Sequence, residues 1–145
     1  MNKSWKAGAL LIGGLAFGAA PAMAAFPTYS GPWVVNFWQD DNRASVGTVC
    51  LNFTNSGSPP FGSSIGGTFN SPNVAGWNGS WVQQGDRIRW WGSLGSTATS
   101  SEGTLINPNL ATGHYSHYQV PPGGVGGVSI GTWSAQPGTP GTAPC

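Results

Sequence analysis

Charged side chains are scarce in this chain of 145 residues, where they make up 6% of the sequence. Both lysines, Lys3 and Lys6, lie at the very start, so the rest of the chain has three arginines, four acidic residues and a formal charge of minus one. Nucleic acids and anionic membranes are bound through clustered basic side chains that displace counterions. We therefore expect no nucleic-acid partner and no adsorption to an anionic membrane.

Long apolar runs are also missing, apart from one at residues 7–20. That run follows the two lysines, precedes Ala22-Met23-Ala24, and is shorter than the ~20 residues of a membrane-spanning helix. A charged start, an apolar middle and an A-x-A site together are typical of a secretory leader. We expect residues 1–24 to be a cleaved signal peptide, with a retained membrane anchor as the alternative. The protein is then exported to the bacterial periplasm or the extracellular medium, without membrane insertion.

Cysteine occurs only twice, at Cys50 and Cys145. An even number of cysteines in an exported chain favours a disulfide. Closing so long a loop contributes roughly 4 to 5 kcal/mol in the chain-entropy description. The bond would hold the Pro/Gly-rich C-terminal tail, residues 137–145, against a strand. The alternative is that Cys145 is free or pairs between two molecules.

Features of long helices are absent too, because the chain has 24 glycines and 12 prolines and lacks a convincing 3.6-residue apolar stripe after residue 25. Runs rich in β-branched and aromatic residues instead alternate with polar residues and are separated by Gly, Pro, Asn or Ser clusters, which indicates strands. The eight expected strands are 32–38, 46–53, 64–69, 77–83, 86–92, 102–106, 112–119 and 128–135. We place them in one β-barrel domain, residues 25–136.

The connections between these strands are short, which makes neighbouring strands antiparallel. The simplest all-β topology is an up-and-down meander of about eight strands, a number that can close into a barrel. Closure also removes edge strands, which matters in a chain with few charges to discourage edge pairing. A two-sheet β-sandwich is the alternative.

Period-two alternation assigns side chains to faces. Trp77, Gly79 and Trp81 share one face of their strand. In the next run Ile88 and Trp90 share one face, while Arg87, Arg89 and Trp91 share the other. Trp33, Val35 and Phe37 likewise lie opposite Val34, Asn36 and Trp38. A turn at Gln84-Gly85 joins the two tryptophan-bearing runs in a hairpin, so their Trp faces lie side by side.

Glycine two residues before an aromatic residue recurs at five places. The segments are Gly31-Pro32-Trp33, Gly67-Thr68-Phe69, Gly79-Ser80-Trp81, Gly113-His114-Tyr115 and Gly131-Thr132-Trp133. On a strand the two residues share a face, so the glycine leaves room for a neighbouring ring or for a sharp coil of the strand. This rhythm resembles the small exported calycin barrels, the lipocalin and avidin group. The resemblance implies an open-ended cup for a small ligand, although the biotin contacts of avidin find no matching positions.

Catalytic motifs are missing. A glycosidase pairing of Asp86 with Glu102 is possible in principle, but nothing around these residues indicates the burial that would raise one pKa. His114 and His117 are three residues apart on a strand, which sends them to opposite faces and disfavours a shared metal. No nucleophile, phosphate-loop or dinucleotide motif occurs. We expect neither enzymatic activity, nor a metal site, nor a cofactor.

Aromatic side chains remain as the candidate binding surface. Trp38 and Trp91 lie on faces opposite the other large aromatics of their strands, and rings with polar neighbours are typical of sugar platforms and small-ligand cups. We expect a non-catalytic binding module for a small apolar, aromatic or carbohydrate ligand at one barrel mouth. The expected contacts are Trp38, Arg89, Trp91 and Tyr118. The alternative is a structural or protein-interaction component of the cell surface or periplasm, which contacts another protein or copies of itself.

Overall fold

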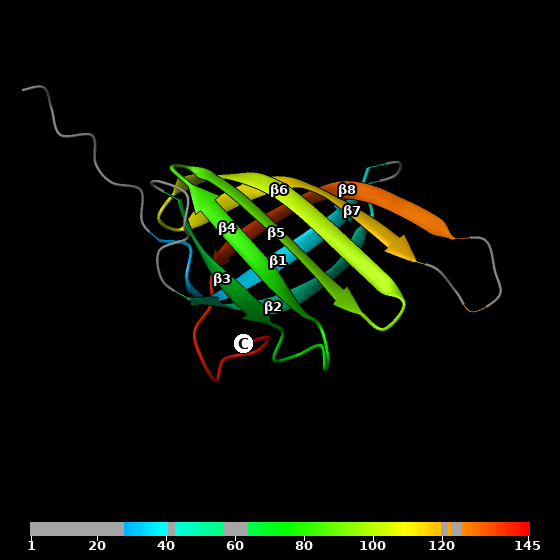
Figure 1. Cartoon of the computed structure of the whole chain (residues 1–145), viewed down its shortest axis with the longest axis horizontal. Coiled ribbons are helices and arrows are strands. Elements are labelled where there is room, and N and C mark those ends of the chain that lie inside the picture. Colours follow the sequence, from blue (N-terminus) through cyan, green and yellow to red (C-terminus); the bar gives the residue numbers. More distant parts are fainter. Residues whose placement is uncertain (1–27, 41–42, 57–63, 120–121, 123–125) are drawn as a thin grey trace, which may run out of the picture.

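The computed structural model describes residues 28–40, 43–56, 64–119, 122 and 126–145. These residues form eight strands: β1 (Gly31–Gln39), β2 (Ser45–Asn55), β3 (Ser64–Asn70), β4 (Asn78–Gln84), β5 (Arg87–Leu94), β6 (Thr97–Asn107), β7 (Leu110–Gln119) and β8 (Gly127–Pro137). Each strand pairs antiparallel with the next, and β8 pairs with β1 to close a barrel (Figure 1). The all-β meander is confirmed in its closed form, and the sandwich is ruled out.

Within the described ranges, no helix has the length and apolar character needed to cross a bilayer. The expected signal peptide, residues 1–24, lies outside the described residues. Strand β8 continues to Pro137, one residue past the expected domain end.

The sixth strand is the largest departure from expectation. It was predicted at 102–106 but begins at Thr97. Its first half consists of Ala, Ser and Thr, without the apolar alternation that marks a half-buried strand. Thr99 and Ser101 nevertheless point inward and are buried, so hydroxyl side chains line this part of the barrel wall. The turn between β4 and β5 also lies one residue later, at Gly85 and Asp86, where Gly85 has φ +61°.

Aromatic side chains fill most of the barrel interior. The buried apolar residues are Tyr29, Trp33, Val35, Phe37, Leu51, Phe53, Phe69, Trp81, Ile88, Trp90, Leu105, Ala111, Tyr115, Trp133 and Ala135. The inward faces predicted for β1, β4 and β5 are confirmed, since Trp33, Trp81 and Trp90 are buried. Burial of these rings contributes on the order of 1.5–3 kcal/mol each through the hydrophobic effect.

Tyr29 closes the barrel end at which β1 begins. Its ring stacks on Trp33 at 4.1 Å between centroids, and its backbone N–H donates to Gln83 Oε1 at 2.7 Å. Complete burial raises the pKa of the Tyr29 phenol well above its usual range. This end of the barrel is therefore occupied by side chains, and any ligand cavity must lie toward the other end.

Three of the five glycines of the recurring motif, Gly79, Gly113 and Gly131, lie against an aromatic ring. In the β7–β8 pair, Gly113 lies opposite Trp133 and Tyr115 lies opposite Gly131. A methyl group built on Gly113 would come within 2.8 Å of the Trp133 ring, and one built on Gly131 within 2.7 Å of the Tyr115 ring. Each glycine therefore accommodates the ring of the other strand, as the recurring motif predicted.

The seam between β2 and β3 is the shortest in the barrel. It has four residue pairs, which join the last four residues of β2 to the last four of β3. Beyond it, side chains of the β3–β4 connection take the place of a strand. Asn73 Oδ1 accepts from the Cys50 N–H at 2.8 Å, and Ser71 Oγ donates to the Cys50 carbonyl at 2.8 Å. The same connection ends at Trp77, whose carbonyl accepts from the Ser71 N–H.

A disulfide joins Cys50 to Cys145, with 5.1 Å between the Cα atoms. Cys50 is fully buried on β2, and the C-terminal segment crosses the outside of the barrel to reach it (Figure 1). The predicted intramolecular bond is thus confirmed. It fastens the tail to the residue that also holds the β3–β4 connection.

Candidate functional site

A cavity of about 180 Å³ lies at the end of the barrel where β1 finishes and β2 begins, and we call it the mouth cavity. It is lined by Phe37, Val46, Gly47, Val49, Trp77, Thr99, Tyr115, His117 and Ser129. Trp77 comes from the β3–β4 connection, and its ring packs 6.2 Å from both Phe37 and Trp90. The wall is mainly apolar, and its polar groups come from β6, β7 and β8.

Among the described residues, four buried polar side-chain atoms lack a hydrogen-bond partner; Tyr29 Oη lies at the filled end of the barrel, and the other three lie in one row near this cavity. Trp90, Ser101 and Tyr115 lie opposite one another in a single cross-strand row. Within the described residues, no hydrogen-bond partner satisfies Trp90 Nε1, Ser101 Oγ or Tyr115 Oη. An unpaired buried polar group costs about 1–3 kcal/mol, so a ligand that bonds to one of them removes that cost.

His117 and Thr99 form the polar side of the mouth cavity. His117 Nδ1 and Thr99 Oγ1 share a hydrogen bond of 2.8 Å. Partial burial lowers the pKa of His117, because the charged imidazolium is poorly solvated there. At neutral pH the cavity therefore presents a neutral imidazole. His114 is exposed on the other face of β7, as the spacing of the two histidines predicted.

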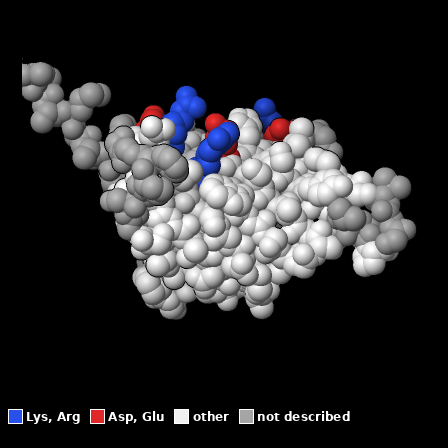
Figure 2. All heavy atoms as spheres, viewed as in Figure 1, with Lys and Arg blue, Asp and Glu red and all other residues white. Residues whose placement is uncertain are grey.

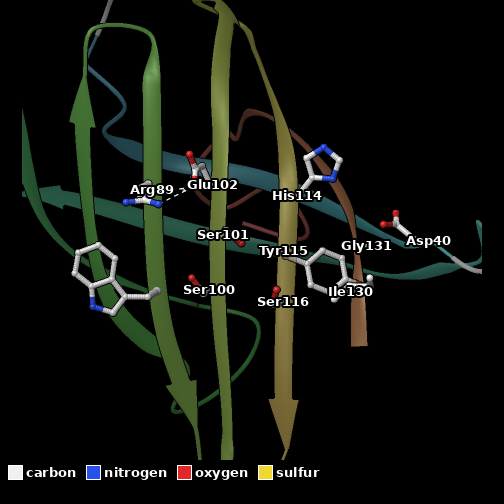
Figure 3. A pocket seen from close by; sticks show the side chains of 11 residues that line it. Asp40, Arg89, Ser100, Ser101, Glu102, His114, Tyr115, Ser116, Ile130 and Gly131 are labelled. Atoms are coloured by element: carbon white, nitrogen blue, oxygen red, sulfur yellow. Dashed lines mark hydrogen bonds and ion pairs between the residues drawn. The ribbon is translucent and has the colours of Figure 1, made fainter. Parts of the chain in front are cut away.

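A second depression, the outer groove, crosses the outside of β5 to β8 and has a volume of about 610 Å³ (Figure 3). One cross-strand row sets its shape: Trp91, Ser100, Ser116 and Ile130 are successive register partners. Two serines form the floor, and the two larger side chains stand at either side, three strand spacings or about 14 Å apart. Glu102 and His114 form the next row along the strands.

Arg89 and Glu102 join in an ion pair at the edge of the outer groove, with 2.8 Å between Arg89 Nη2 and Glu102 Oε2 (Figure 3). Arg89 Nε also donates to the same oxygen at 3.2 Å. Both side chains are more than half exposed. In Figure 2 the charged side chains of the visible face gather along its upper edge and leave most of that face neutral.

The structure divides the four predicted contacts. Arg89 and Trp91 line the outer groove, and Trp91 also lines an adjoining hollow of about 460 Å³ with Tyr118. Trp38 lies apart from them on β1, beside Asp40, Arg43 and Thr132. All four side chains are on the outside of the barrel, and none lines the mouth cavity. Glu102 is paired with Arg89, and the described part of the chain holds no cluster of three potential metal ligands.

None of the residues that line the mouth cavity is among the four contacts predicted from the sequence. Alternation placed Phe37 on the same face as Trp33, and Trp77 on the same face as Trp81, but it cannot distinguish a ring in the packed core from one beside a cavity. Thr99 belongs to the half of β6 that was not predicted as a strand. The sequence did contain one signal: alternation places three polar residues, Thr99, Ser101 and His117, on the same faces of β6 and β7 as buried core residues.

No protein-family model, no curated protein and no solved structure matches this chain.

Proposed function

We propose that this protein is an exported, calycin-like barrel that binds a small, mostly apolar ligand with one polar group in the mouth cavity. One observation carries the proposal: an apolar cavity in an otherwise filled barrel has a buried tyrosine hydroxyl, Tyr115 Oη, without a partner among the described residues. Export is supported by the disulfide, because such bonds persist in oxidising compartments.

The volume of the cavity limits the ligand to about one ring. Cavities near 150 Å³ with apolar walls accept benzene, so about 180 Å³ suits a ring with a single substituent. Phe37 and Trp77 offer aromatic contacts, while Tyr115 Oη and the Thr99–His117 pair offer hydrogen bonds to the substituent. The ligand class is therefore a monocyclic aromatic or similarly sized apolar molecule with one hydrogen-bonding group.

Thermal unfolding with phenol and with toluene tests this proposal. A ligand that binds only the folded state raises Tm, and the shift grows with ligand concentration, so we expect phenol to raise Tm and to act at lower concentration than toluene. Ser129→Phe places a ring in the mouth cavity and should abolish the shift. Ser134→Phe adds the same ring on the outer face of β8 and should leave it unchanged. No shift by either probe in the unmodified protein would refute the proposal.

Tyr115→Phe tests the polar contact separately. The variant should bind toluene as the unmodified protein does but lose its preference for phenol, because the hydroxyl partner is gone. Calorimetric titration with both compounds measures that preference. An unchanged phenol preference would remove Tyr115 from the site.

A protein-interaction role is the second candidate, and exposed apolar side chains favour it. Tyr118 and Val128 are register partners on the outside of β7 and β8, and Ile130 lies two residues beyond Val128. These three side chains are between 48% and 66% exposed. Light scattering across a hundredfold dilution tests self-association. A constant monomer mass would exclude it.

A further inference from the structure

The outer groove has the composition of a ligand site distinct from the mouth cavity. Trp91 is 49% exposed, although it lies within a strand rather than in a loop. Its register partners are Ser80 on β4 and Ser100 on β6, whose side chains are too short to cover an indole. A large ring therefore stands uncovered above a floor of serine hydroxyls. Exposed rings of this kind supply apolar contact area for a ligand.

The groove continues on the mouth side of Trp91. The adjoining hollow shares Trp91, Ser100 and Ser116 with the outer groove, and it adds Ser93 and Tyr118 among its walls. Tyr118 is 48% exposed, so a second ring is available there. Because the two hollows share these three residues, we treat them as one trough, with Trp91 along both parts and Tyr118 along the second.

Charge narrows the class of ligand. Arg89 is neutralised by Glu102, and Asp40 is the remaining carboxylate of the lining. No unpaired Lys or Arg lines either hollow within the described residues. Anionic ligands lack a counter-charge here, and single-stranded nucleic acid binds to aromatic rings only where a basic groove holds its backbone. A purely apolar ligand would leave the serine hydroxyls buried without hydrogen-bond partners, and it would remove water from the ion pair.

We propose that this trough binds a neutral oligosaccharide, with Trp91 and Tyr118 packed against sugar rings. The ring faces carry negative partial charge and attract the C–H groups of a sugar face. Arg89, Glu102, His114 and the floor serines are polar groups that pair with hydroxyls of either donor or acceptor character. The ligand class and the position on the outer wall separate this site from the mouth cavity.

Affinity electrophoresis tests the inference with soluble hydroxyethyl cellulose, glycogen and laminarin as neutral probes and polygalacturonate as the anionic one. At least one neutral polysaccharide should retard the protein, and polygalacturonate should not. Trp91→Ala should weaken the retardation at least tenfold in apparent Kd. Ser116→Leu, which fills the floor, should weaken it as well. Ile106→Ala removes an exposed apolar side chain of β6 outside both hollows and should leave migration unchanged.

Each other outcome counts against the inference. Migration unaffected by all three neutral probes overturns it, and so does stronger retardation by polygalacturonate. Retention of full binding by Trp91→Ala places the contact elsewhere. Ser129→Phe, which blocks the mouth cavity, should still bind the polysaccharide. The proposal for the trough and the proposal for the mouth cavity can therefore be refuted independently.

Discussion

Single residues decide how this barrel responds to pH. His117 is the inward histidine of β7, and burial lowers its pKa from the usual value of about 6.5. At pH values just below 6.5, His117 is therefore protonated in the unfolded chain but remains neutral in the folded chain. Stability rises with pH wherever the unfolded state binds more protons. The stability that neutral His117 contributes is therefore fully present above the unfolded pKa, and it is lost as pH falls toward the lower pKa of the folded state.

We expect the free energy of unfolding to fall as pH is lowered from about 7.5 through about 6.5 and below. Urea unfolding at half-unit pH steps measures the slope. His117→Gln keeps a polar side chain but removes the titration, so its slope across this interval should be smaller. Equal slopes for the two proteins would contradict the assigned cause.

At the scale of elements, the pairing of β7 with β8 depends on glycines that admit rings. A methyl group on Gly131 would meet the Trp38 carbonyl oxygen of β1 as well as the Tyr115 ring, while Gly127 on the same strand has open space at its Cβ position. Overpacking of a filled interior costs about 1–3 kcal/mol because neighbouring side chains must leave their preferred positions. The two glycines therefore differ in their tolerance of a methyl group.

Gly131→Ala should lower the free energy of unfolding by about 1–3 kcal/mol, as measured in urea. Gly127→Ala is the matched control and should change it by less than about 0.5 kcal/mol. A similar loss in both variants would mean that the general cost of replacing glycine, rather than crowding against Trp38 and Tyr115, is responsible.

Alternation and turn residues in the sequence were enough to predict eight strands and most of their extent. The tryptophan faces of β4 and β5, the strand count and the interlocking glycines all follow from period two. The first half of β6 did not, because Thr97 to Ser101 contains no apolar side chain larger than that of Ala98 and becomes a strand only through pairing on both sides. Sequence could place Trp91 and Arg89 on one face. It could not predict that cross-strand neighbours would be serines, since register depends on the whole barrel.

At the scale of the whole molecule, closure depends on the seam between β2 and β3. Its four pairs are supplemented by Ser71 and Asn73, which bond to the backbone of Cys50. The disulfide to Cys145 acts at the same residue. Disulfides typically contribute about 2–4 kcal/mol to stability, which is less than the chain-entropy description gives for a loop of this length.

Cys145→Ser should therefore reduce the free energy of unfolding by about 2–4 kcal/mol. Urea unfolding of the variant, and of the unmodified protein with and without dithiothreitol, measures the effect. The reduced unmodified protein should match the variant. Equal stability of the oxidised and reduced forms would show that the bond has no role in closure.

Cys50 links the disulfide to the wall of the mouth cavity. Its backbone holds the connection that ends at Trp77, a wall of the mouth cavity. If the mouth cavity binds the proposed ligand, thiol reagents in an assay buffer should change that binding as well as fold stability. By reciprocity, an occupant that favours the cross-linked form protects that form from reductants by the same free energy. Binding experiments on this chain are comparable only at a stated redox condition.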